Sequence, residues 1–62
     1  MCEFTVLLGG EEVFKDAIYA KVDGSKVVLK DVLGASKILE NCTITEIDVG
    51  SERLVLSSIK AS

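Results

Sequence analysis

The sequence contains no histidine, and this absence restricts the chemistry that the chain can carry out. No serine lies in a recognisable nucleophile motif, and no pair of carboxylates has a spacing typical of an acid–base pair. The glycines form neither of the common phosphate-binding patterns, GxGxxG and GxxxxGK[ST]. We therefore predict a protein that is not an enzyme, with no catalytic and no cofactor-binding residues.

Cysteine is also scarce, with two residues in a chain of 62. Two cysteines allow at most one internal disulfide, which excludes the cysteine-dense framework of small secreted domains. A chain this short buries only about 60% of the surface that its unfolded form exposes, so it usually needs an additional source of stability. We expect a homodimer to provide it.

Basic residues are few, scattered and outnumbered, with seven lysines and arginines against ten acidic residues. The resulting pI of about 4.7 argues against nucleic acid as a partner, because nucleic-acid binders normally carry a clustered basic surface. The apolar runs are much shorter than a membrane span, and the first residues lack the pattern of a targeting segment. We expect a cytoplasmic protein that does not associate with a membrane.

Alternation of apolar and polar residues, typical of half-buried strands, dominates the chain. Turn signals such as Gly9-Gly10, Asp23-Gly24 and Gly50-Ser51 separate the alternating segments. Residues 36–41 (SKILEN) fit either a short strand or a single turn of helix. The expected strands are residues 2–8, Ala17 to Val22, Lys26 to Lys30, Ile44 to Val49 and Arg53 to Ser57.

Five or six short strands without a substantial helix predict an all-β fold. Only three aromatic residues are present, so leucine, valine and isoleucine must fill the core. We expect a small antiparallel β-barrel of the SH3-like or Sm-like kind, formed by residues 1–62 as a single domain. Closing the barrel would remove the exposed edges of a small sheet.

The Met1-Cys2 start is the most chemically specific feature of the chain. The Met1 amine, the Cys2 amide nitrogen and the Cys2 thiolate could form two fused chelate rings around one metal ion. Nitrogen and sulfur donors suit Ni(II) or Cu(II), which favour square-planar geometry. One chain has too few donors for a closed site, whereas two chains would supply two thiolates. The alternative interpretation is that Cys2 is a small hydrophobic residue at the start of a strand.

Two further features have competing interpretations. Cys42 is either a second ligand or disulfide partner, or a free thiol that is buried or half-buried, and free cysteines are commonly buried. The carboxylates of Glu11, Glu12 and Asp16 could attract a hard cation. Neighbouring residues of a strand point to opposite faces, however, and we interpret this segment as a solvated loop.

Three segments together resemble the CooT family of small nickel-binding proteins: residues 1–4 (MCEF), residues 20–34 (AKVDGSKVVLKDVLG) and residues 44–56 (ITEIDVGSERLVL). The similarity extends over nearly the whole chain in length and in the order of its elements. The resemblance implies a homodimer that holds one Ni(II) between its subunits through Cys2. It also implies a role in delivering nickel to an enzyme such as carbon monoxide dehydrogenase.

The same resemblance gives Cys42 no role, because that residue lies outside the matching motif. It leaves open the client enzyme, the choice between nickel and copper, and whether Met1 is removed in the cell. A second hypothesis is a non-catalytic barrel that binds RNA or a protein partner. That hypothesis predicts an exposed groove with basic or aromatic side chains and a function that does not depend on Cys2.

Overall fold

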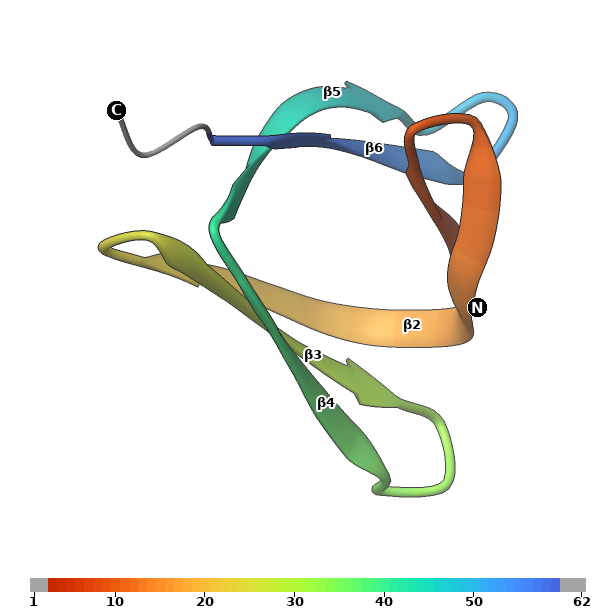
Figure 1. Ribbon diagram of the computed structural model, residues 1–62. Helices are drawn as coiled ribbons and strands as arrows, with labels where there is room; N and C mark the ends of the chain where they lie inside the picture. The colour runs from red at the N-terminus through yellow and green to blue at the C-terminus, as the bar shows by residue number, and fades with distance from the viewer. Residues whose placement is uncertain (1–2, 60–62) are drawn as a thin grey trace.

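The computed structural model describes residues 3–59, which form six strands and no helix (Figure 1). The predicted all-β class is confirmed. No helix in the part of the chain that is described is long and apolar enough to span a membrane. The strands are β1 (Phe4–Leu8), β2 (Glu11–Asp23), β3 (Lys26–Asp31), β4 (Ser36–Glu40), β5 (Cys42–Asp48) and β6 (Arg53–Ser58).

All six strands belong to one curled sheet with the order β4-β3-β2-β1-β6-β5. The expected barrel is not closed by hydrogen-bonded pairing, since β4 and β5 remain the two edges of the sheet in residues 3–59. The curl nevertheless brings the ends of the sheet together, and the Cys42 N–H donates to the Ser25 carbonyl at 3.1 Å. Four of the five pairings are antiparallel as expected, but β1 and β6 run parallel.

The long strand β2 pairs with β1 through its first half and with β3 through its second half. Two register shifts lie where it changes partner, one around Lys15 and Asp16 and the other at Ile18. Asp16 has a φ of 59°, a left-handed conformation that aspartate adopts more readily than most residues. Bulges bend a strand and increase its twist, so β2 turns the sheet back upon itself.

The core lies on the inner face of this curl and consists of small and medium-sized side chains. Leu29 and Val27 of β3 and Val6 of β1 are fully buried, as alternation along each strand predicts. Phe4 and Phe14 are half-buried and pack against this cluster. The seven buried residues are Val6, Ala17, Val27, Leu29, Cys42, Leu54 and Leu56.

Both hairpin predictions are confirmed, the open choice at residues 36–41 is decided in favour of the strand, and one local prediction needs correction. The hairpins at Asp23-Gly24 and Gly50-Ser51 are present, and Gly24 has the positive φ of 62° that a tight hairpin loop requires. Residues 36–40 form strand β4, because they pair with β3 along their whole length. Glu11 and Glu12 are exposed but begin β2, so the segment predicted to be a solvated loop is a strand.

We predict that Leu29→Ala lowers the free energy of unfolding by about 2–5 kcal/mol, because it leaves a cavity in the centre of the core. Leu33→Ala is the matched control, since Leu33 is 89% exposed in the β3–β4 connection. That control should change stability by less than about 0.5 kcal/mol. Chemical denaturation followed by circular dichroism measures both. Equal losses for the two variants would contradict the assignment of the core.

Candidate metal centre

The predicted ligands Met1 and Cys2 lie outside the described residues. The strand that follows them in the sequence is β1, which lies inside the sheet between β2 and β6. Thr5 donates its N–H to the Glu52 carbonyl at 2.9 Å, which ties the start of β1 to the β5–β6 turn. The polypeptide therefore enters the sheet at a firmly held position.

Chain length alone limits how far the predicted ligands can lie from this anchor. Cys2 is two residues before Phe4, and two residues of extended chain span at most about 7 Å. Phe4 is half-buried and packs against the core. Any metal held by Cys2 is therefore bound close to the end of the sheet at which Phe4 lies.

The other cysteine, Cys42, is buried in the core. Cys42 is the first residue of β5, it is free, and only 1% of its surface is exposed. Its thiol donates to the Leu39 carbonyl at 3.4 Å. The interpretation of Cys42 as a buried free thiol is confirmed.

Burial also makes the Cys42 thiol a poor nucleophile and a poor ligand. Desolvation raises the pKa of Cys42 above its ordinary value, and a hydrogen bond with the backbone of Val27 offsets only part of this effect. The thiolate is the form that binds metals and reacts with electrophiles. Cys42 therefore stays protonated at neutral pH.

The carboxylates of the described chain stabilise turns or face solvent. Asp31 accepts the N–H groups of Leu33 and Ala35, both at 2.9 Å, and so shapes the β3–β4 connection. Asp48 accepts the Ser51 N–H at 3.2 Å. Residues 3–59 contain no group of three or more cysteine, aspartate or glutamate side chains that could hold a metal ion.

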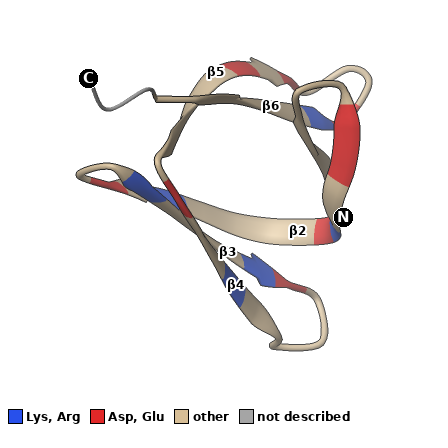
Figure 2. Ribbon diagram, viewed as in Figure 1, with Lys and Arg blue, Asp and Glu red and all other residues tan. Residues whose placement is uncertain are grey.

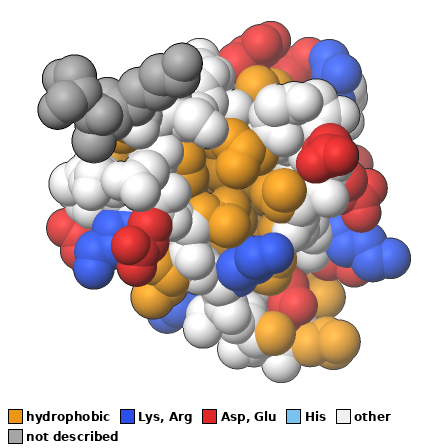
Figure 3. All heavy atoms as spheres, viewed as in Figure 1, with side chains coloured by type: hydrophobic (Ala, Val, Ile, Leu, Met, Phe, Trp, Pro, Cys, Tyr) orange, Lys and Arg blue, Asp and Glu red, His pale blue; other side chains and the backbone are white. Residues whose placement is uncertain are grey.

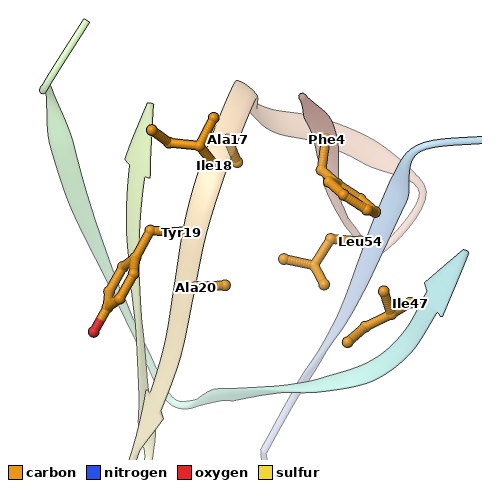
Figure 4. A pocket seen from close by; sticks show the side chains of 7 residues that line it. All are labelled: Phe4, Ala17, Ile18, Tyr19, Ala20, Ile47 and Leu54. Atoms are coloured by element: carbon orange, nitrogen blue, oxygen red, sulfur yellow. The ribbon is translucent and has the colours of Figure 1, made fainter. Parts of the chain in front are cut away.

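An apolar groove that sequence reasoning missed opens at the end of the sheet where Phe4 lies. Its volume is about 180 Å³. In Figure 4 the side chains of Phe4, Leu54 and Ile47 converge on it, and Ala17 and Ala20 face them from β2. Ile18 and Tyr19 complete the lining. The sequence signal for the groove is AIYA at residues 17–20, where apolar residues follow one another without alternation.

Comparison with known proteins identifies the family. The family model described as CO dehydrogenase accessory protein CooT matches residues 1–57 of the 62. The chain belongs to the CooT family. Membership gives it an accessory role for carbon monoxide dehydrogenase, as the resemblance of its three segments predicted. The match includes Met1 and Cys2. No curated protein matches the chain.

We predict that the native protein loses stability as the pH rises above about 9, the ordinary pKa of a cysteine thiol. The folded state holds the Cys42 proton more tightly than the unfolded state does, so stability is complete below the unfolded pKa and declines as pH rises towards the folded pKa. Cys42→Ala should remove this alkaline loss while lowering stability at pH 7. Denaturant titrations at pH 7 and pH 10 measure the free energy of unfolding of both proteins. If Cys42→Ala loses as much stability at pH 10 as the parent protein does, the loss does not come from ionisation of the Cys42 thiol.

Proposed function

We propose that this member of the CooT family is a single-domain, non-catalytic, cytoplasmic nickel carrier. In this proposal, two copies hold one Ni(II) ion as cargo between them. The Cys2 thiolates and the terminal amine or amide nitrogens of Met1 and Cys2 are the ligands. The ion is destined for a nickel enzyme such as carbon monoxide dehydrogenase. Cu(II), which has a similar geometric preference, is the competing ion.

The observation that carries this proposal is the burial of Cys42. The chain has two cysteines and no histidine, and Cys42 is enclosed in the core with a raised pKa. Cys2 is thus the only other thiol with which the chain could bind a soft or borderline metal. Residues 3–59 contain no cluster of side chains that could hold a metal ion, which is consistent with ligands at Met1 and Cys2.

The distribution of charge supports a cation at this end of the molecule. Residues 3–14 and 42–59 contain six carboxylates and one arginine, whereas residues 15–41 contain five lysines against four carboxylates. The strands β1, β5 and β6, and the start of β2, therefore belong to the acidic part of the chain, while the lysines lie mainly on the arm formed by β3, β4 and the second half of β2 (Figure 2). A negative field raises the local concentration of cations.

A nickel titration of the reduced protein should give one ion per two chains, with absorption from thiolate-to-metal charge transfer. Cys2→Ser should abolish the absorption and weaken nickel binding by at least about 100-fold, since a thiolate ligand is lost. Cys42→Ala is the matched control, and it should keep both the absorption and the stoichiometry. Calorimetry and absorption spectroscopy measure these quantities. Undiminished nickel binding by Cys2→Ser would end the proposal.

Nickel affinity should fall steeply in acid, because each thiolate must lose a proton before it binds the metal. Below the ordinary thiol pKa, one released proton per ligand corresponds to a loss of about tenfold in affinity for each pH unit. We therefore expect at least that loss between pH 7 and pH 6. Nickel titrations at the two values, in buffers that do not bind metals, provide the measurement. A pH-independent affinity would point to carboxylate or backbone ligands instead.

A further inference from the structure

The curled sheet ends in two edges, β4 and β5, which differ in regularity. Strand β5 carries a register shift between Ile44 and Glu46, and a bulge of this kind disrupts the row of backbone groups that a further strand needs. Strand β4 pairs with β3 in unbroken register from Ser36 to Glu40. The outer row of N–H and C=O groups of β4 is therefore a regular template to which another strand can add.

The β4 edge is separate from the apolar groove. Figure 3 shows hydrophobic side chains gathered at the centre of the face that looks into the curl. The groove is lined by residues of β1, β2, β5 and β6, with none from β4. Ile38, at the centre of β4, is nevertheless 56% exposed. An exposed apolar side chain on a regular edge strand favours pairing with another chain.

The one lysine of β4 does not protect this edge. Charged side chains on an edge strand normally oppose the addition of another strand. Lys37, however, pairs with the buried Leu29 and so belongs to the inner face. Its Nζ donates to the Val13 carbonyl at 3.0 Å, at the register shift between β1 and β2. The ammonium is thus held against its own sheet, away from the path of an incoming strand.

The side chains on the outer face of β3 and β4 form rows across the two strands. Val27 and Leu29 are buried on the inner face, so alternation places the residues between and beside them on the outer face. The outer row at the centre of the two strands is apolar, and each row beside it contains one lysine. The cross-strand pairs are Lys30 with Ser36, Val28 with Ile38 and Lys26 with Glu40.

We propose that two copies of the chain join through β4, with the two strands antiparallel about a two-fold axis at Ile38. All five residues of each strand are then paired, and the two sheets become one continuous sheet. The contact goes beyond the proposed function, because it involves residues 36–40 alone and needs no metal. Across the axis, Ile38 faces its own copy, Ser36 faces Glu40 and Lys37 faces Leu39.

The outer face is complementary to itself in this register. The two Ile38 side chains meet at the axis and continue the apolar row that begins at Val28. Glu40 of the second copy lies opposite Ser36 and next to Lys30, which has no acidic neighbour in its own row of Tyr19 and Ser36. Two strand spacings separate that glutamate from Lys30 by about 10 Å between Cα atoms, a gap that the two long side chains bridge across the short serine.

Charge also selects this register over the neighbouring one. An axis at Lys37 would set two lysines directly opposite each other, which is destabilising. The contact itself is small, since a strand of five residues covers less than the about 600–1,000 Å² that a standard interface takes from each partner. We therefore expect a reversible association that depends on protein concentration. A second two-fold contact, such as one at the proposed nickel site, would link these pairs into larger assemblies.

The primary test is NMR spectroscopy of the metal-free, reduced protein. Dilution from millimolar to micromolar concentration should shift the amide signals of residues 36–40. In a mixture of isotopically labelled and unlabelled chains, nuclear Overhauser effects between chains should connect Lys37 with Leu39. Signals of residues 36–40 that do not change on dilution would overturn the pairing and leave the edge to a strand of another protein. Contacts between chains that exclude β4 would overturn it as well.

A variant pair separates the β4 contact from a general effect of charge. Ile38→Lys sets two ammonium groups opposite each other at the axis, and it should weaken the association at β4 by at least about tenfold. Val49→Lys adds the same charge at a residue that is 62% exposed beyond the end of β5, and it should leave the dilution shifts of β4 unchanged. Circular dichroism verifies that both variants are folded. Equal effects of the two variants would contradict the proposed axis.

A disulfide trap keeps the test decisive if Ile38→Lys unfolds. Directly opposite residues have Cβ atoms about 4.5–5.5 Å apart, close to the separation that a disulfide needs. In a Cys2→Ser background the only other thiol is the buried Cys42. Ile38→Cys should therefore form linked dimers in a glutathione buffer. Lys21→Cys is the control, since the proposed register sets its two copies about 24 Å apart. Equal linking of the two variants would overturn the interface without bearing on nickel binding.

Discussion

Strand β2 pairs with β1 through its first half and with β3 through its second half, and it bends where it changes partner. A single flat sheet of this length would expose both of its faces. The left-handed conformation at Asp16 and the register shift at Ile18 let the sheet curl around one set of apolar side chains. The core of seven buried residues depends on that bend, because β1, β3, β5 and β6 all contribute to it.

The same bend shapes the apolar groove that lies beside the core. It sets Ala17 and Ala20 on one side of the groove and leaves Phe4, Leu54 and Ile47 on the other. Phe4, two positions after Cys2 in the sequence, belongs to the interior strand β1 and lines the groove. A chain this small cannot bury all of its apolar surface, and part of the uncovered surface lies in the groove that Phe4 lines.

The two cysteines differ chiefly in their environment. Cys42 lies between the two ends of the curled sheet, where its backbone N–H bonds to Ser25 and its thiol bonds to Leu39. It behaves as a small apolar residue that helps to join β5 to β3. Cys2 remains the predicted nickel ligand through membership of the family and the elimination of other donors. Acidic side chains at the start of β2 and along β5 would favour a cation at the proposed site.

The sequence by itself determined the all-β class, the two hairpins at Asp23-Gly24 and Gly50-Ser51, and the family. Those features depend on residue alternation and turn chemistry over a few neighbours, which a sequence displays directly. Only the tertiary structure decided that β2 begins at Glu11, that residues 36–40 are a strand, that β1 and β6 run parallel, and that the groove stays open. Each of these depends on which distant strand lies alongside, and no local pattern records that choice. For the same reason, the burial of Cys42 could be expected from its residue type but established only by the fold.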